Sequence, residues 1–388
     1  MKKSLLALAA GAFALGFAEF VVMGIITNVA AGVGVTVPEA GGFISAYAIG
    51  VCFGTLILVF GHNIAPKKLL LLFMALCCAG NALAAVSPDA ATLTVARFVS
   101  GMPHGAFFGT ATIVAKALAE KGQESRAVAV MVLGQTLANT LGVPFGTLLA
   151  GLVSWRAAFA FVAAWALLSL ALIARLVPEV AAVASKGFAN QFRFLGRPGP
   201  WVVLGAVFLG NSGIFCWWSY VSPWLETIGG WSEAVLPALL VLAGAGMVVG
   251  SQLGGQVGDR LTPGWAAAIG QAVSCASMLL IFAFSGSRAG SAALMFLCCV
   301  GLFFPSSPQQ LAMVEVGRGG GEMIGSACVQ VAFNGGNAVG ASIGQAVLDA
   351  GLAYNYPALV GAPIAAAAVA LLCIYALRFE REYHQASA

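Results

Sequence analysis

Charged side chains are scarce in this sequence. Only 8% of its 388 residues are Asp, Glu, Lys or Arg, while 60% are hydrophobic. A soluble globular protein carries about 25% charged residues, so this chain has too little polar surface to cover a fold in water. We therefore expect lipid to be its solvent. Backbone groups in lipid must bond within the structure, and the long unbroken apolar runs favour helices over the alternating strands of a barrel.

Catalytic and nucleotide-binding motifs are also missing. The sequence has no phosphate-binding glycine-lysine loop, no nucleophile elbow and no HExxH pair. Its nine cysteines lie inside apolar segments, where we interpret them as small packing residues, and its three histidines are scattered. We expect no enzyme activity, no cofactor and no metal site. Without a basic patch interleaved with aromatics, we expect no nucleic-acid partner.

Apolar runs long enough to span a bilayer recur along the whole chain. The connections between them are short, except for a central stretch, residues 178–199, that holds turn residues and basic side chains. We predict an all-α membrane protein in which this linker joins two six-helix, pseudo-repeated bundles, 1–177 and 200–388. The twelve predicted membrane-spanning helices cover residues 5–31, 39–60, 69–87, 90–114, 127–152, 156–177, 201–224, 234–257, 264–285, 289–313, 323–349 and 357–378.

Basic residues follow the positive-inside pattern. With the N-terminus inside, every Lys and Arg except Arg97, Arg156 and Arg288 falls on the inner side. Both termini are therefore expected in the cytoplasm. The first apolar run continues without a convincing cleavage site, so we interpret it as an uncleaved helix, with a signal peptide as the alternative.

The two halves share a motif. The spacing Asn-x-x-Gly-x-x-x-Gly occurs at 139–146 in the fifth predicted helix and again at 337–344 in the eleventh. Repeated bundles with a substrate site near the bilayer midplane are typical of secondary transporters. The sequence therefore indicates a transporter with a six-plus-six repeat.

Two ionisable residues lie deep inside predicted spans. Glu19 is in the first span and Arg97 in the fourth, and a rise of 1.5 Å per residue from opposite faces puts them at similar depths. We expect them to pair, directly or through water, because an unpaired charge in hydrocarbon costs about 3 kcal/mol. The functional hypothesis is that Glu19 carries a proton, Arg97 tunes it and His104 relays it. The structural alternative is a static ion pair beside a packed histidine.

Amide and aromatic side chains on several predicted helices indicate a cavity for a neutral, hydroxylated or amphipathic solute. Amides can equally bond helices together, so both interpretations stay open. Small residues and a proline indicate close helix packing and a hinge. The candidate substrate-binding residues are Asn139, Asn211, Phe215, Trp218, Gln309, Gln330, Asn334 and Asn337, and the candidate hinge and packing residues are Gly101, Gly105, Gly142, Pro144, Gly146, Gly340 and Gly344.

Several stretches resemble a known family. The Arg97-x-x-x-Gly101-x-x-x-Gly105 motif and the Gly/Pro motif of the fifth predicted helix resemble those of the major facilitator superfamily, and within it of the drug:proton antiporters. The segments GFAEFVVMG, PHGAFFG, GVPFGT, SWRAAF, CCVGLF and GLAYNY are similar to bacterial arabinose (sugar) efflux permeases. The resemblance implies transport by alternating access and nothing specific about the solute.

The residues and the resemblance together suggest one function. We expect a monomer in the bacterial inner membrane, surrounded by the lipid bilayer, that exports a small organic solute in exchange for protons. The solute would be a sugar such as arabinose or a drug-like compound. A proton-independent facilitator is the first alternative, and transport insensitive to uncouplers would identify it. A non-transporting membrane sensor is the second, and the lack of a sizeable soluble domain argues against it.

Overall fold

The structure is a computed structural model that describes residues 2–60, 64–120, 124–180, 192–317 and 322–380. These ranges are helical and contain no β-strand. The chain divides into two compact units, Met1–Ser185 (unit 1) and Lys186–Ala388 (unit 2). Half of the predicted linker, residues 181–191, lies outside the described residues, so the predicted domain boundaries stay a prediction.

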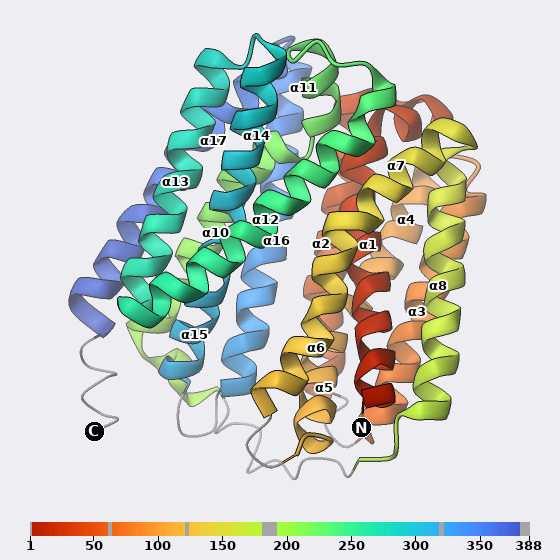
Figure 1. Ribbon diagram of the computed structural model, residues 1–388, viewed down its shortest axis with the longest axis vertical. Coiled ribbons are helices and arrows are strands. Elements are labelled where there is room, and N and C mark those ends of the chain that lie inside the picture. Colours follow the sequence, from red (N-terminus) through yellow and green to blue (C-terminus); the bar gives the residue numbers. More distant parts are fainter. Residues whose placement is uncertain (1, 61–63, 121–123, 181–191, 318–321, 381–388) are drawn as a thin grey trace. The chain divides into compact units, whose positions relative to one another are not determined.

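Four helices of unit 1 each match one predicted range, and the first of them is kinked at Ile25, whose backbone angles are not helical (φ −123°, ψ 16°). They are α1 (Lys2–Val33), α2 (Val37–Phe60), α3 (Pro66–Val86) and α8 (Trp155–Leu176). Helix α8 packs against both α1 and α3, and α2 packs against α1 (Figure 1). Their sequences are apolar almost throughout, so each can satisfy its backbone internally while its side chains face either lipid or the neighbouring helices.

The predicted helix over residues 90–114 is divided in two. It consists of α4 (Ala90–Gly101) and α5 (Pro103–Ala117). Helix α4 begins where the Asp89 carboxylate accepts a hydrogen bond of 2.8 Å from the backbone N–H of Thr92. This bond also lowers the pKa of the Asp89 carboxyl from its usual value. Pro103 has no backbone N–H with which to continue the ladder, so α5 begins there.

The predicted helix over residues 127–152 is also interrupted. Helix α6 (Glu124–Leu137) leads into a π-helical turn, Ala138–Gly142, and then into α7 (Val143–Leu152). The N–H of Val143 bonds to the carbonyl oxygen of Ala138, five residues back. The wider turn accommodates Pro144, whose ring would clash with a regular helix and which cannot donate a hydrogen bond.

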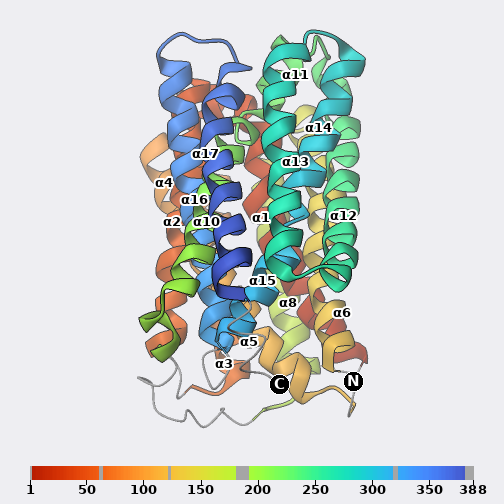
Figure 2. The same ribbon diagram turned by 90° about the vertical axis from the view of Figure 1, so that its left-hand side faces the viewer.

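Unit 2 is built from helices in the remaining predicted ranges. Helix α10 (Pro198–Trp218) packs against α16 (Glu322–Asp349) and α17 (Tyr356–Ile374), and α13 (Pro263–Phe284) packs against α14 (Arg288–Phe303) and α17 (Figure 2). Two predicted helices are again divided, one into α10 and α11 and the other into α14 and α15. The helices are α10 (Pro198–Trp218), α11 (Val221–Thr227), α12 (Leu236–Arg260), α13 (Pro263–Phe284), α14 (Arg288–Phe303), α15 (Ser306–Val316), α16 (Glu322–Asp349) and α17 (Tyr356–Ile374), with short helical turns at Arg193–Gly196, Glu233–Val235 and Tyr375–Phe379.

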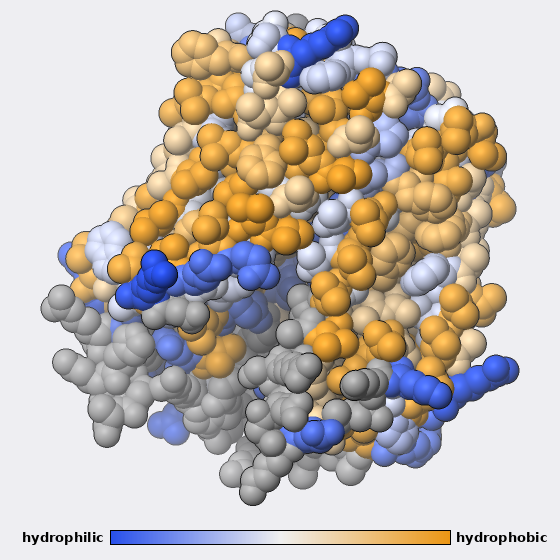
Figure 3. Space-filling model, viewed as in Figure 1, coloured by the Kyte–Doolittle hydropathy of each residue, from blue (hydrophilic) through white to orange (hydrophobic). Residues whose placement is uncertain are grey.

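The surface and the helix lengths identify a multi-pass membrane protein. In the described residues, nine helical stretches are long and apolar enough to cross a membrane. They represent all predicted spans except 90–114 and 127–152, which are interrupted, and 323–349, which is rich in glycine and amides. Apolar side chains cover the flanks of the helices, and hydrophilic ones gather toward the helix ends (Figure 3). The number of twelve spans stays a prediction.

Glycines let helices of each unit touch at the backbone. In unit 2, a Cβ at Gly340 of α16 would overlap the carbonyl oxygen of Ser212 on α10. In unit 1, a Cβ at Gly101 of α4 would overlap that of Tyr47 on α2. Helices in lipid associate through such close packing because no hydrophobic force drives them together.

The other candidate packing residues lie at helix contacts as well. A Cβ at Gly146 of α7 would come within 2.7 Å of the Phe17 ring on α1, and one at Gly142 would lie 3.3 Å from the same ring. Pro144, between them, is buried, as is Gly105 of α5. In unit 2, Gly344 faces the backbone of α10 one turn beyond Gly340. A hinge role for these residues stays a prediction.

Two adjacent glycines of α12 provide a test of this packing. A Cβ at Gly254 would overlap the carbonyl oxygen of Phe304, whereas one at Gly255 would meet nothing within 4 Å. We expect Gly254→Ala to destabilise the protein by about 1–3 kcal/mol through overpacking. Gly255→Ala should leave stability unchanged or raise it, because alanine favours a helix over glycine. Melting temperatures of the two purified variants check this, and equal values would contradict it.

Candidate functional site

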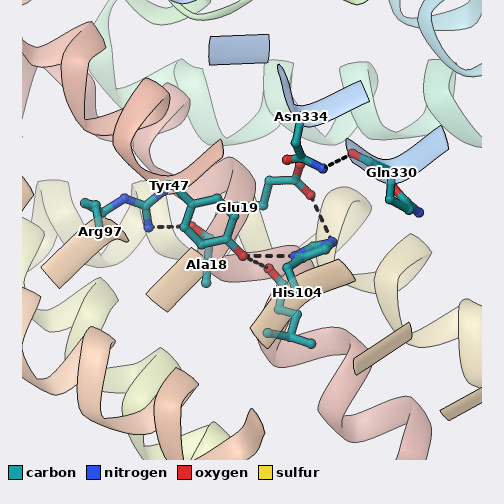
Figure 4. Close-up of polar contacts among 8 residues, drawn as sticks. Ala18, Glu19, Tyr47, Arg97, His104, Gln330 and Asn334 are labelled. Atoms are coloured by element: carbon teal, nitrogen blue, oxygen red, sulfur yellow. Dashed lines mark hydrogen bonds and ion pairs between the residues drawn. The ribbon is translucent and has the colours of Figure 1, made fainter. Parts of the chain in front are cut away.

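Arg97 of α4 is fully buried, and groups of two other helices hold its guanidinium. Nη1 donates to the carbonyl oxygen of Ala18 on α1 at 2.7 Å, and Nε donates to that of Phe43 on α2 at 3.4 Å. The guanidinium carbon also stands 4.4 Å from the centre of the Tyr47 ring (Figure 4). Backbone carbonyls and an aromatic face thus replace water around this cation and join α4 to α1 and α2.

The Glu19 carboxyl on α1 contacts His104 of α5. Its Oε2 lies 3.5 Å from Nε2 of the imidazole, and both side chains are buried. That separation suits an ion pair if the histidine is protonated, but it is long for a hydrogen bond, and neither carboxyl oxygen has a hydrogen-bond partner among the described residues. Glu19 and Arg97 form no direct ion pair: Nη1 and Nε of Arg97 bond carbonyl oxygens, and Nη2 has no hydrogen-bond partner among the described residues. The other form of the expectation, a pair through water, stays a prediction. The two residues still lie at the same level, since Arg97 binds the carbonyl of Ala18.

Tyr47 of α2 connects these groups. Its hydroxyl is 2.9 Å from Nδ1 of His104 and 3.2 Å from the carbonyl oxygen of Leu15 on α1. In Figure 4 its ring lies between Arg97 and His104. The Leu15 carbonyl, the Tyr47 hydroxyl, the His104 imidazole and the Glu19 carboxyl therefore form one buried polar chain, to which α1, α2 and α5 contribute.

Tyr47 is the functional candidate that sequence reasoning missed. It is a lone tyrosine in the apolar segment ISAYAIG, and such a residue signals packing as readily as proton chemistry. A buried hydroxyl in a membrane helix needs a partner, and that requirement is the one signal in the sequence that could have drawn attention to it.

Asn139 is the remaining polar candidate of unit 1. It is buried in the π-helical turn Ala138–Gly142, a type of turn that is frequent at functional sites. Its Oδ1 has no hydrogen-bond partner in the part of the chain that the structure describes. This acceptor is therefore available but is not part of the buried polar chain.

The amide candidates of unit 2 bond largely within their own helices. Nδ2 of Asn334 donates to the carbonyl oxygen of Gln330 at 3.0 Å (Figure 4), and Nδ2 of Asn211 donates to that of Val207 at 2.8 Å. The Oδ1 atoms of Asn334 and Asn337 are buried and, among the described residues, unpartnered. An unsatisfied buried acceptor costs about 1–3 kcal/mol. These two oxygens are the amide groups of unit 2 best placed to gain from a solute.

Unpartnered indole nitrogens gather where α10 ends. The Nε1 atoms of Trp217, Trp218 and Trp224 are buried and find no acceptor within the described ranges. Only Trp218 was a candidate from the sequence. Of the other candidates, Phe215 packs edge-on against Phe333 at 6.1 Å, and Gln309 of α15 is buried.

The arrangement in unit 1 supports proton exchange. A carboxyl and an imidazole, the two side-chain types that take up and release protons between weakly acidic and neutral pH, meet in a buried position beside a fixed cation. Among the residues that the structure describes, no three His, Cys, Asp or Glu side chains cluster closely enough to hold a metal ion.

Comparison with known proteins decides the family. The sequence model described as Major Facilitator Superfamily matches residues 8–327. The chain belongs to the major facilitator superfamily. It is therefore a transporter with a small-molecule substrate, and not an enzyme.

Curated relatives of this major facilitator protein cover nearly its whole length. It is 41% identical over 383 residues to the candidate transporter AraJ of Escherichia coli (strain K12), a match of 98% of this chain and 97% of AraJ. It is 35% identical over 370 residues to the inner membrane transport protein YdhP of the same strain, covering 95% of this chain and 94% of YdhP.

More distant relatives carry names that mention cargo. A chloramphenicol resistance protein of Streptomyces lividans is 30% identical over 259 residues, 65% of this chain and 66% of that protein. A probable sugar efflux transporter of Helicobacter acinonychis (strain Sheeba) is 28% identical over 271 residues, 69% of each chain. These descriptions apply to those proteins.

A solved structure has the same fold. The crystal structure of a bacterial homolog to the human lysosomal transporter Spinster, in an inward-facing and unoccupied conformation, matches with a TM-score of 0.70. The sequence identity is 15%, and the match covers 98% of this chain and 96% of the other. The all-α architecture is therefore that of the major facilitator proteins.

Replacing Arg97 by lysine tests how the buried cation is held. Lysine keeps the charge but cannot bond two carbonyls through a planar fork, so Arg97→Lys should cost about 1–3 kcal/mol of stability. Arg156→Lys is the matched control, because Arg156 also binds a carbonyl, that of Ser87 at 2.9 Å, and stacks on Trp155, yet it is only partly buried. Melting temperatures should fall more for Arg97→Lys, and equal falls would contradict the special role of burial.

Proposed function

We propose that this protein exports a small organic solute in exchange for protons by alternating access. The contact of Glu19 with His104, 3.5 Å apart in the interior of unit 1, supports the proposal most strongly. A carboxyl that is buried among membrane helices without a hydrogen bond is costly, and ionisable residues in such places are functional by default. Glu19 is the proposed proton carrier.

His104 and Arg97 have separate roles in this scheme. His104 is the proposed relay, because its Nε2 is the nearest titratable partner of Glu19. Arg97 stabilises the carboxylate that remains after proton release. Hydrogen bonds to carbonyl oxygens of α1 and α2 hold its guanidinium in place, and its Nη2 has no hydrogen-bond partner among the described residues. A fixed cation near the carboxyl favours the ionised form without forming a contact that would have to break.

The proposed topology has twelve spans, two six-helix bundles, 1–177 and 200–388, and a linker at 178–199. Helices within each of the twelve predicted ranges and the positive-inside distribution of basic residues support it. We place the protein in the bacterial inner membrane with both termini in the cytoplasm, as the name of the relative YdhP suggests. Nothing in this scheme requires more than one copy, so we propose a monomer.

A hydroxylated or amphipathic solute suits uncharged polar groups that each unit holds by itself. In unit 2 these are the acceptors Asn334 and Asn337 and the donor Trp218, and in unit 1, taken alone, the acceptor is Asn139. Such uncharged donors and acceptors match hydroxyl groups without demanding a charge. A sugar and a drug-like compound such as chloramphenicol are the two classes that the names of relatives suggest, and arabinose is the sugar expected from the sequence.

Glu19→Gln tests proton coupling directly. In proteoliposomes with an acidic lumen, the native protein should accumulate labelled arabinose or chloramphenicol as protons leave. The glutamine variant should lose this accumulation, because an amide cannot release a proton, but should still exchange labelled for unlabelled solute. Driven accumulation that persists in the variant would contradict the proposal.

The control for that experiment is Glu39→Gln. Glu39 is an exposed carboxylate near the start of α2 that bonds the backbone N–H and hydroxyl of Thr36, so it has the same chemistry outside the bundle. The Glu39→Gln variant should accumulate solute like the native protein. Accumulation by the native protein that is insensitive to an uncoupler would favour the proton-independent facilitator instead.

A thermal-shift screen identifies the solute class. Purified protein is heated with sugars or with antibiotics at two pH values. A bound solute should raise the melting temperature by mass action. At a solute concentration of a hundred times its dissociation constant, the free energy of unfolding rises by about 2.7 kcal/mol. We expect a positive shift with one class only and a dependence of that shift on pH. Shifts with neither class would contradict the assigned solutes.

A further inference from the structure

The hydroxyl of Tyr47 is shared between two acceptors. It lies 3.2 Å from the carbonyl oxygen of Leu15 and 2.9 Å from Nδ1 of His104. A hydroxyl has a single proton, so it can donate to only one of them at a time. When it donates to Leu15, its oxygen must accept a hydrogen bond from the N–H of Nδ1. When it donates to Nδ1, that nitrogen must be bare.

The protonation state of Nδ1 determines whether Nε2 can donate to Glu19 or accept from it. A neutral histidine carries one ring proton, so a proton on Nδ1 leaves Nε2 as an acceptor, and a bare Nδ1 makes Nε2 a donor. Nε2 faces Oε2 of Glu19 at 3.5 Å. An accepting Nε2 suits a protonated carboxyl, whereas a donating Nε2 suits a carboxylate.

The two protonation states of Glu19 therefore require different hydrogen-bond arrangements. With the proton loaded, the buried polar chain holds three protons: one on the Glu19 carboxyl, which faces Nε2, one on Nδ1 and one on Tyr47, which donates to Leu15. On release, the carboxyl proton of Glu19 moves onto Nε2 and the proton on Nδ1 leaves to water on the open side, so that two remain: one on Nε2 and one on Tyr47, which now donates to Nδ1. The ring proton of His104 changes from Nδ1 to Nε2, and the Tyr47 hydroxyl keeps its proton but changes its acceptor from the Leu15 carbonyl to Nδ1.

We infer that Tyr47 is a positioning residue whose hydroxyl sets the tautomer of His104 according to whether Glu19 holds its proton. The inference rests on the proposed role of Glu19 as proton carrier. It adds the hydrogen bond through which the tautomer of His104 follows the protonation state of Glu19. When Glu19 is protonated, the Tyr47 hydroxyl of α2 donates a hydrogen bond to the Leu15 carbonyl of α1. When Glu19 is ionised, that hydrogen bond is broken.

The surroundings hold the aromatic parts in place while the protons change. The Tyr47 ring is covered by the Arg97 guanidinium at 4.4 Å and meets the imidazole edge-on at 6.0 Å. Phe108 lies against the other part of the imidazole, with ring centres 5.2 Å apart. All four side chains are buried, so a water molecule cannot readily replace the hydroxyl as donor.

Few other titratable groups are near this chain. From the helices packed around it, α1 contributes Glu19, α2 contributes Tyr47, α4 contributes Arg97 and α3 contributes the buried thiol of Cys77. Arg97 lies on the face of the Tyr47 ring and does not compete for its hydroxyl. The carbonyl of Leu15 also lies within bonding reach of the imidazole. The tautomer of His104 is therefore decided by Glu19 at Nε2 and, at Nδ1, by the Tyr47 hydroxyl together with that carbonyl.

Nitrogen-15 NMR of labelled histidine in lipid bilayers tests the inference, because ring nitrogens with and without a proton have separate resonances. The full-length chain with His62→Gln and His384→Gln retains His104 alone. As the pH rises through the range in which transport responds, we expect Nδ1 to change from protonated to bare and Nε2 to stay or become protonated. A wild-type Nδ1 that keeps its proton throughout would overturn the inference.

Tyr47→Phe removes only the hydroxyl. Without a donor for Nδ1, and with the Leu15 carbonyl free to accept from it, Nδ1 should stay protonated at every pH, so the pH-dependent change is lost. If Nδ1 of the Tyr47→Phe variant still changes from protonated to bare as in the native protein, Tyr47 does not set the tautomer.

Tyr220→Phe is the matched control. Tyr220 is a buried tyrosine of unit 2 whose hydroxyl donates to the carbonyl oxygen of Ala341 at 3.1 Å. It does not belong to the buried polar chain of Leu15, Tyr47, His104 and Glu19. It should leave the His104 resonances unchanged. If Tyr47→Phe does not fold, Glu19→Gln decides instead, because a glutamine at this position should make Nδ1 insensitive to pH.

The outcome is separable from that of the proposed function. Loss of driven accumulation in Glu19→Gln together with native resonances in Tyr47→Phe would overturn the role of Tyr47 alone. Persistent accumulation in Glu19→Gln would overturn the proton carrier itself, whatever the histidine resonances show.

Discussion

A cation in a lipid-embedded bundle must be solvated by the protein, and Arg97 shows how this chain does it. Its guanidinium bonds the carbonyl oxygens of Ala18 and Phe43, each of which also belongs to a helix. A carbonyl oxygen has two lone pairs, so it can accept this second hydrogen bond without giving up the helical one. Because backbone carbonyls supply partners for the guanidinium, the Glu19 carboxyl contacts His104 and forms no ion pair with Arg97.

Close helix packing makes that arrangement geometrically accessible. Gly101 places α4 against the backbone of Tyr47, and a Cβ at Gly50 of α2 would in turn overlap the carbonyl oxygen of Phe98. The same contact that packs the two helices therefore brings the Arg97 guanidinium over the Tyr47 ring. Larger residues at these glycines would separate α2 from α4 and take the ring away from the cation.

The two units use a shared motif differently. Asn139 lies in a π-helical turn, whereas Asn337 lies in the continuous helix α16. The difference follows from one position: Pro144 in unit 1 is matched by Ser342 in unit 2, whose hydroxyl bonds the carbonyl oxygen of Ala338 and leaves the helix regular. The ionisable chain lies in unit 1, while the unpartnered amide and indole groups of unit 2 carry no charge.

The sequence by itself determined the solvent of this protein, its helical class, its family and the equal depth of Glu19 and Arg97. Composition and the length of apolar runs settle the solvent, the helical class and the depths, because these depend on one helix at a time, whereas the family follows from the likeness of sequence motifs to those of known proteins. Only the tertiary structure decided which side chains meet. Every residue has a carbonyl oxygen, so nothing in the sequence marks Ala18 and Phe43 as the partners of Arg97, and the rotation of each helix against its neighbours is what brings Tyr47 to His104. Helical periodicity fixes the face on which a residue lies, but packing between helices fixes what that face touches.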